Sequence, residues 1–214
     1  MVRPVFRRVK AEEDRREERR HERRLVHLDR DRALVESALR DPAAFDALYR
    51  KYLAQVYSYA YYELGSHPDA EDAAERTFLL ALGALARFEE RARPADGEGA
   101  STFRVWLFRI AHNVLANIQR GQRRHPVAPL DFAAVVADPL DLEGDVSRRQ
   151  EAGVAWAAVG RLPPERRRAL VLRFVEEMST AEIAGILGRS EGAVRVLIHR
   201  GLRAVARDLG GRRW

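Results

Sequence analysis

The chain has 214 residues, 46% of them hydrophobic and 33% charged, which suits one large or two small globular domains with a buried core. The formal net charge is +6, and arginine supplies nearly all of the positive charge, so we expect a polyanionic partner such as phosphate. The chain has no cysteine, which excludes disulfides and cysteine-ligated zinc. It also lacks a membrane-length apolar run and a signal-peptide core, so we expect a cytoplasmic protein.

Residues 1–28 form a charged N-terminal extension without an apolar stripe. Pairs such as Glu12 with Arg16 are suitably spaced to support a solvated helix. The same composition is also typical of a segment that stays disordered until it binds a partner. Both interpretations remain open from the sequence.

Residues 29–124 carry helical patterns. Asp41 and Pro42 are good residues for a helix start, since Asp caps a helix and Pro suits its first position. A break is expected at 65–68, after which Ser66 or Asp69 caps the next helix. The first of these helices has apolar residues at three- and four-residue spacing: Phe45, Leu48, Tyr49, Tyr52, Val56 and Tyr59. The second has its apolar face at Ala73, Ala74, Phe78, Leu82 and Leu85.

A loop at 89–101 precedes a third apolar helix in this half of the chain, for which Ser101 is the expected cap. That helix ends in a basic cluster at 120–124. Its apolar residues are Phe103, Trp106, Leu107, Ile110, Val114, Leu115 and Ile118.

The composition changes at 126–146, where three prolines and five acidic residues occur without a basic one. We interpret this segment as a flexible linker between two domains. Helical pattern resumes near Ser147, and no segment has convincing strand alternation. The predicted fold is therefore all-α, with two small helical domains at 29–124 and 148–214 joined by an acidic linker at 125–147.

Residues 178–200 have the form of a helix-turn-helix. Ser179 or Thr180 caps the first helix, and Glu182 stands where it completes a capping box with Ser179. Gly188 falls where that helix must end, and Ser190 caps the second. Ile183 and Leu187 are expected to point inward from the first helix, and Val194, Leu197, Ile198 and Leu202 from the second.

The opposite face of the second helix is then free to enter the major groove of DNA and contact base edges and phosphates. We predict DNA contacts from Ser190, Glu191, Arg195, Val196, His199, Arg200 and Arg203, with Arg200 facing phosphate. The preceding helix, expected at 163–174, supports this motif. The run Arg166 to Arg168 on that helix is either a solvated face or a further DNA contact.

Two segments of the first domain resemble the bacterial RNA polymerase sigma factors of the small extracytoplasmic-function type, within the sigma-70 family. Residues 71–79 resemble the polymerase-binding helix of sigma domain 2, and residues 102–113 resemble its promoter-melting segment. Three short segments of the second domain in turn look like sigma domain 4, namely 162–166, 182–184 and 191–194. The matches occur in the order of the family, with a linker between them.

The resemblance implies a non-enzymatic subunit that directs core polymerase to promoters without a cofactor. It implies polymerase contacts, with the beta-prime clamp helices, at Asp72, Glu75 and Arg76. It further implies -35 recognition by domain 4, a beta-flap contact, a flipped-base site at loop 89–101, and an anti-sigma protein as partner of a free monomer. Contacts to the -10 DNA are implied for Asn113, Asn117, Arg120, Arg123 and Arg124.

The sequence departs from the family pattern at several of these positions. The family usually has Gln-Glu where Glu75-Arg76 stands, and commonly Asp at Asn117. It commonly has Thr at Ala193 and Ser-Arg at 196–197. The promoter sequence preference therefore cannot be transferred from relatives.

A second hypothesis is a helix-turn-helix regulator with a helical sensor domain, which predicts a dimer and a pocket within 29–124. A nucleic-acid hydrolase is disfavoured because the carboxylates lie in mixed-charge runs. Metal binding is not expected, since the histidines show no ligand spacing. A protein that only mimics the sigma fold is disfavoured by the DNA-facing residues in both domains.

Overall fold

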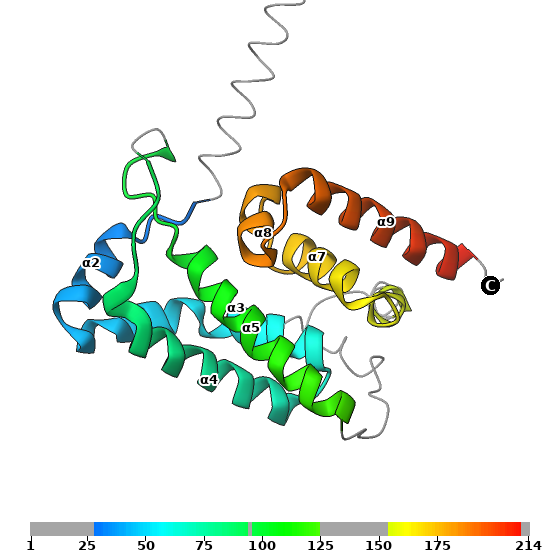
Figure 1. The fold of residues 1–214 in the computed structure, drawn as a ribbon, viewed down its shortest axis with the longest axis horizontal. Helices are drawn as coiled ribbons and strands as arrows, with labels where there is room; N and C mark the ends of the chain where they lie inside the picture. Colours follow the sequence, from blue (N-terminus) through cyan, green and yellow to red (C-terminus); the bar gives the residue numbers. More distant parts are fainter. Residues whose placement is uncertain (1–27, 94–95, 125–153, 211–214) are drawn as a thin grey trace, which may run out of the picture.

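The computed structural model describes residues 28–93, 96–124 and 154–210, and within them every regular element is a helix. The predicted all-α class is confirmed. The linker and all but Leu28 of the N-terminal extension lie outside the described residues. The elements are α2 (Arg32–Arg40), the 3-10 helix η1 (Pro42–Ala44), α3 (Phe45–Leu64), α4 (His67–Ala84), η2 (Leu85–Arg87), α5 (Phe103–Arg124), an α-helix whose described part is 154–160, α7 (Pro164–Phe174), α8 (Thr180–Leu187) and α9 (Glu191–Gly210) (Figure 1).

Local signals set the helix boundaries much as the sequence predicted. Asp41 accepts a hydrogen bond from the Ala43 amide, and the short helix η1 then leads into α3. Gly65 ends α3 in the left-handed conformation with φ of 69°. The Ser66 hydroxyl caps α4 by accepting from the Asp69 amide. Each of these contacts joins residues close in sequence, which is why the sequence alone indicated them.

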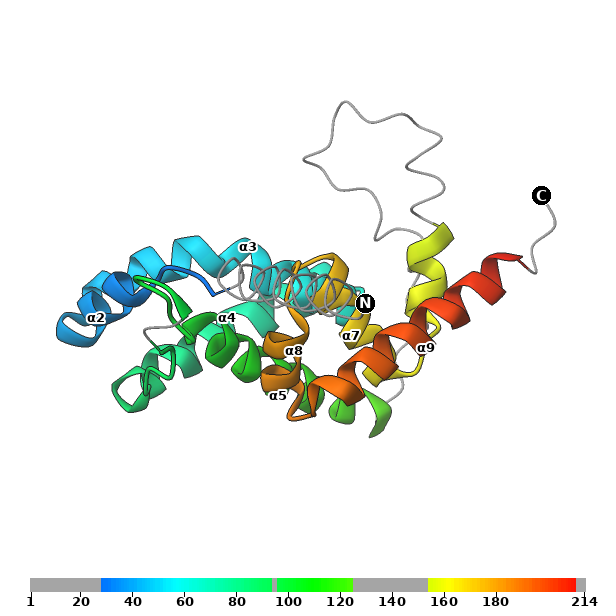
Figure 2. The same cartoon turned by 90° about the horizontal axis from the view of Figure 1, so that it is seen from above.

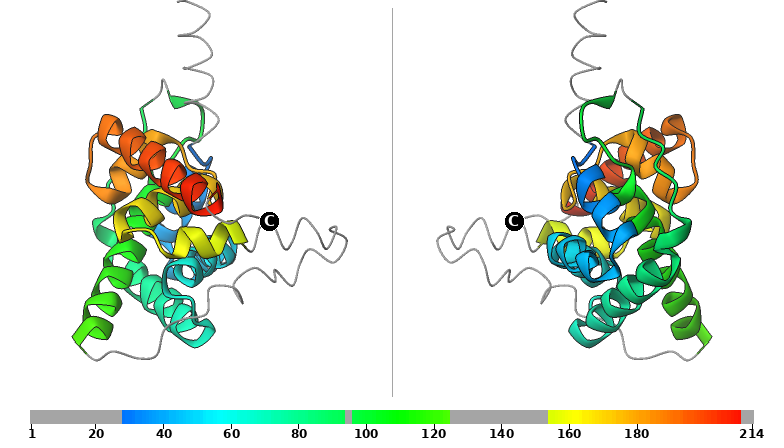
Figure 3. Two further views of the ribbon diagram at one scale, coloured as in Figure 1. Left: turned by 90° about the vertical axis from the view of Figure 1, so that its right-hand side faces the viewer. Right: turned by 90° about the vertical axis from the view of Figure 1, so that its left-hand side faces the viewer.

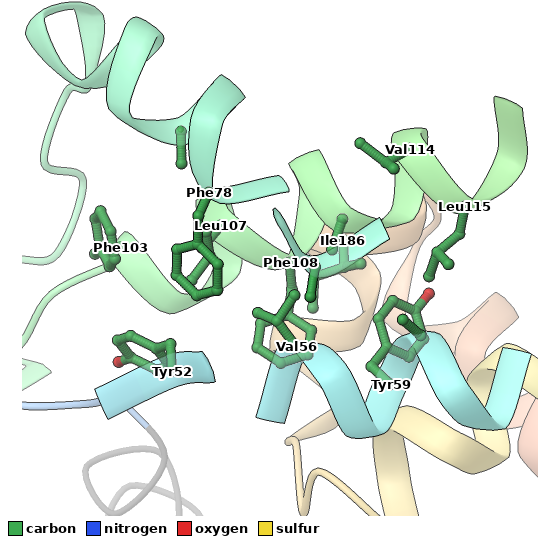
Figure 4. Close-up of a cluster of buried hydrophobic side chains, with 14 of the residues drawn as sticks. Tyr52, Val56, Tyr59, Phe78, Phe103, Leu107, Phe108, Val114, Leu115 and Ile186 are labelled. Atoms are coloured by element: carbon green, nitrogen blue, oxygen red, sulfur yellow. The ribbon is translucent and has the colours of Figure 1, made fainter. Parts of the chain in front are cut away.

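Helices α3, α4 and α5 pack together as the first unit, around aromatic and aliphatic side chains shown in Figure 4. The predicted inward stripe of α3 is buried except for Tyr49, which is 37% exposed. On α4 the prediction for Leu82 was wrong, because that side chain is 43% exposed. Ala81 is buried instead, since the buried stripe of α4 passes through Ala70, Ala73, Ala74, Thr77, Phe78 and Ala81.

Helices α7, α8 and α9 form the second unit. Ser179 and Glu182 make both hydrogen bonds of the predicted capping box, and Gly188 ends α8 with φ of 63°. The prediction that Leu202 is buried was wrong, since it is 45% exposed. Gly201 is buried in its place, and a Cβ there would lie 3.1 Å from the Leu170 side chain on α7. Because glycine has no side chain, α9 can approach α7 closely at Gly201, and Leu202 then lies on the exposed side of the helix.

The two units are packed against each other, a contact that the sequence did not predict. Helix α8 lies on α5, and α7 lies on α3, as the views in Figures 2 and 3 also show. A single hydrophobic cluster runs through both units, so that Ile183, Ile186 and Met178 share a core with α3 and α5. This packing positions α9 relative to α5.

Candidate nucleic-acid interface

The outward face of α9 is fully available to a ligand. Ser190 caps the helix by accepting from the Ala193 amide at 3.2 Å. Arg195 and Glu191 form an exposed ion pair at 3.6 Å, which is weak because both groups remain hydrated, so that they can exchange partners readily. All seven predicted contact residues on this face are exposed: Ser190, Glu191, Arg195, Val196, His199, Arg200 and Arg203.

A pocket of about 670 Å³ adjoins this face, between α7 and α9. Four arginines and Ala206 line it, and the arginines are Arg166, Arg200, Arg203 and Arg207. Such a density of guanidinium groups suits a phosphate backbone. Arg207 was not among the residues predicted from the sequence, and the role of Arg166 was left open. Arg207 could have been identified from its spacing of four and seven residues from Arg203 and Arg200, because this spacing puts all three arginines on one helix face.

Helix α5 presents a second polar face. Asn113, Asn117 and Arg120 are exposed, and the Arg120 guanidinium donates a hydrogen bond to the Asn117 side-chain oxygen. Amide and guanidinium groups on one face of a helix can hydrogen-bond both bases and phosphates. Arg123 and Arg124 continue the helix backbone, and their side chains lie outside the described residues.

Helix α4 presents an exposed surface of mixed charged and apolar character. Asp72, Glu75 and Arg76 are all exposed, as the sequence interpretation requires. Next to them stand three exposed leucines, namely Leu79 at 63%, Leu80 at 53% and Leu82, which was predicted to be buried, at 43% exposure. A cluster of exposed leucines beside charges is typical of a protein–protein interface.

The loop between η2 and α5 is held by hydrogen bonds at both ends. Glu90 accepts from the amides of Ala92 and Thr102 and from the Thr102 hydroxyl. Burial alone would raise the pKa of Glu90, but these hydrogen bonds and one from Ser101 lower it. Arg32 donates to the carbonyl oxygens of Ala92 and Ala100, which ties the loop to the start of α2.

Among the described residues, no group of three or more His, Asp or Glu side chains is arranged to hold a metal ion. None of the described helices is both long and apolar enough to cross a membrane.

The exposed faces of α4, α5 and α9 lie in two segments of the chain that match known protein families. The family model for sigma-70 region 2 matches residues 48–125, and the model for sigma-70 region 4 matches residues 153–205. The RNA polymerase sigma-H factor of Pseudomonas aeruginosa is 30% identical over 196 residues, which cover 85% of this chain and 94% of that protein. This chain belongs to the sigma-70 family of RNA polymerase sigma factors.

Other relatives of this sigma factor are named as ECF sigma factors. The ECF RNA polymerase sigma factor BldN of Streptomyces coelicolor is 35% identical over 181 residues, covering 82% of this chain. The chain spans 64% of the length of that relative.

Two solved structures share the fold. CnrH, in complex with the cytosolic domain of CnrY, has a TM-score of 0.59 and 27% identity, covering 86% of this chain and all of that one. The sigma factor RpoE, in complex with the anti-sigma factor NepR from Bartonella quintana, has a TM-score of 0.61 at 20% identity, covering 79% of this chain and 98% of that one.

The region 2 match includes α4 and α5, and the region 4 match includes α7, α8 and most of α9. Titratable groups are buried where the two regions meet. Burial raises the pKa of Glu176 to about 8, an effect that Arg104 and a hydrogen bond with Ser58 partly offset. Burial and the nearby Arg168 guanidinium lower the pKa of His112 to about 4. Both groups are therefore largely uncharged at neutral pH.

Proposed function

We propose that this sigma factor directs bacterial core RNA polymerase to specific promoters, without catalysing a reaction itself. The observation that carries the proposal is the presence of two exposed polar helix faces on one chain, on α5 in region 2 and on α9 in region 4. A protein with two such faces can contact two DNA elements at once. Phosphate contacts then supply affinity, and base contacts supply sequence choice.

In region 4, α9 is proposed to lie in the major groove of the -35 element. Glu191, Arg195 and His199 stand in its exposed N-terminal half, where base edges are within reach. The pocket with Arg166 and Arg207 then faces the flanking phosphates.

In region 2, Asn113, Asn117 and Arg120 are proposed to contact the -10 DNA, with Arg123 and Arg124 beyond them. The loop 89–101 stands at the N-terminal end of α5, where it resembles the loop that takes up a flipped base in other sigma factors. The hydrogen bonds of Glu90 and Arg32 support such a role because they hold the described parts of this loop in place.

The exposed face of α4 is proposed as the contact with core polymerase, at the beta-prime clamp helices. Asp72, Glu75 and Arg76 supply charge, and the adjacent leucines Leu79 and Leu80 supply apolar area. Arg76 places a positive charge where the family pattern usually has Glu. The leucines are therefore expected to contribute more of the affinity than the charge pairs do.

An anti-sigma protein is proposed as a further partner. A sigma factor with this fold has been solved in complex with the anti-sigma factor NepR. We further propose that the free protein is monomeric and works in the cytoplasm, where polymerase and promoter DNA are found.

Run-off transcription tests the proposal. Core polymerase is assayed with and without this protein on a library of promoter fragments, and discrete start sites are expected only in its presence. Leu79→Lys should abolish initiation while leaving DNA binding intact. Leu39→Lys is the matched control, because Leu39 is also exposed, at 44%, but lies on α2. Initiation that never depends on the protein would refute the proposal.

A further inference from the structure

The segment before α2 is paired with the end of the loop that precedes α5. The Ser101 amide donates to the Asp29 carbonyl oxygen at 2.9 Å. The Arg32 amide in turn donates to the Gly99 carbonyl oxygen at 3.2 Å. The two stretches of backbone therefore lie side by side, although they are far apart in the chain.

The Arg32 side chain joins the two arms of this loop, residues 89–93 and 99–101. Its Nε donates to the Ala100 carbonyl oxygen at 3.3 Å, and its Nη2 donates to the Ala92 carbonyl oxygen at 3.1 Å. A guanidinium group is planar and presents its N–H donors in fixed directions, so one side chain can hold two carbonyl groups at a set separation. The ammonium of a lysine is a point charge on a flexible stem and has no such fork.

The Glu90 carboxylate makes a second tie between the arms. One of its oxygens accepts from the Ala92 amide at 2.9 Å, in the first arm, and from the Thr102 amide at 2.8 Å, directly after the second. The Thr102 hydroxyl donates to the same oxygen at 2.9 Å. This tie is local to the loop, whereas the bonds of Arg32 connect the loop to the N-terminal part of the chain.

The segment 29–32 is itself fixed to α3 by buried polar groups. Asp31 is buried and forms an ion pair with Lys51, whose ammonium also lies 3.7 Å from the Asp29 carboxylate. The Tyr52 hydroxyl donates to the carboxylates of both Asp29 and Asp31. Burial raises the pKa of Tyr52 and the two carboxylates raise it further, so the hydroxyl keeps its proton and remains a donor.

This anchor lies outside the part of the chain that the region 2 model matches, because that match begins at residue 48. The loop lies inside the match, and its backbone is adaptable where Gly97 and Gly99 have positive φ values of 108° and 73°. A loop that is already ordered loses less conformational entropy when it binds a ligand. The anchor can therefore strengthen binding at the loop without touching the ligand.

We propose that Arg32 is a positioning residue for reading the -10 element. It holds the two arms of loop 89–101 together so that the loop can take up a base from the opened strand, while Tyr52 and Lys51 hold the segment that carries Arg32. This inference rests on the proposed function, which assigns the base to this loop. Taking a base out of the stack costs free energy that contacts in the loop must offset, so a loosened loop loses base discrimination.

Arg32→Lys tests the proposal in holoenzyme assembled from core polymerase and the full chain. The variant keeps the positive charge but lacks the fork that bridges Ala92 and Ala100. Run-off transcription from promoters that carry each base at each -10 position measures the preference for the best base at every position. We expect this preference to fall by about fivefold or more at one position or two adjacent positions, the size of effect typical of one mismatched base pair. Preferences at the -35 element should not change.

Arg40→Lys is the matched control, because Arg40 is exposed on the same helix and its guanidinium donates to the Glu36 carbonyl oxygen within α2. Hydrogen exchange of the free protein gives a second readout. Arg32→Lys should speed exchange at the Ser101 amide and leave exchange in α9 unchanged. Tyr52→Phe covers the case in which Arg32→Lys does not fold, and it should weaken base preference at the same position while keeping the ring.

Two results would overturn the proposal. One is an unchanged base preference at every -10 position in the folded variants. The other is a loss spread evenly over the -10 and -35 positions, because that would indicate general damage to the fold. If the wild-type holoenzyme itself starts at no discrete site, the proposed sigma function fails instead, and the two failures are thereby distinguished.

Discussion

The buried carboxyl of Glu176 makes the stability of the protein depend on pH in a specific direction. It lies in the turn between α7 and α8 with 4% of its surface exposed, facing Arg104 on α5 and Ser58 on α3. Burial raises its pKa from 4.5 to about 8. Between these values the folded protein holds a proton that the unfolded chain has released. The free energy of unfolding therefore falls as pH rises through this window.

His112 acts in the opposite sense at lower pH. Its pKa falls from 6.5 to about 4 in the folded protein, so its contribution to stability is lost as pH falls through that range. The two effects largely cancel between pH 4.5 and 6.5. Above pH 6.5 the Glu176 effect remains. With about 1.4 kcal/mol per pKa unit, the expected loss of unfolding free energy from pH 6.5 to pH 8 is roughly 1.5 kcal/mol.

Urea unfolding at pH 6.5 and pH 8 measures this difference. Glu176→Gln has no carboxyl to titrate, so its unfolding free energy should change little over the same range. Glu177→Gln is the matched control, because Glu177 is exposed and adjacent, and it should keep the wild-type decline. An equal decline in wild type and Glu176→Gln would show that the reasoning about Glu176 is wrong.

Three further predictions follow from the region 4 and α4 geometry. The double variant Arg166→Ala/Arg207→Ala should lower the slope of log K for DNA binding against log salt concentration by about 2, without altering sequence preference. Binding titrations over a range of salt concentrations measure this slope, and an unchanged slope would mean that the DNA does not contact this pocket. Gly201→Val should lower the free energy of unfolding by about 1–3 kcal/mol, because the added side chain crowds α7. Gly83→Ala should raise it by up to about 1 kcal/mol, because Gly83 lies in a helix with open space around it. Thermal unfolding of the two variants measures both changes. Ser179→Ala should lower the free energy of unfolding by about 1 kcal/mol, because it removes the cap of α8. Ser179→Thr should keep most of that stability in the same unfolding measurement, because Thr can also cap a helix.

Two exposed leucines, on α4 and α9, show which part of the packing could not be predicted from the sequence. Apolar spacing on α4 and α9 predicted buried positions for Leu82 and Leu202, and both side chains are exposed. A helix with apolar residues on more than one face has more than one possible buried stripe. On α9 the choice was made by Gly201, whose close approach to α7 could not be known before the neighbouring helix was placed.

The sequence by itself determined the helical segments, most of their ends and the outward face of α9, because these depend on residue spacing and on interactions within a few residues. The capping box of Ser179 with Glu182 is such a case, as is the left-handed Gly188. Only the tertiary structure decided how the two regions meet. The run Arg166 to Arg168 was open between a solvated face and a DNA contact, and the structure places Arg167 and Arg168 on Glu63, more than a hundred residues away in the chain. Pairing at that separation depends on how whole helices pack, and local sequence carries no signal for it.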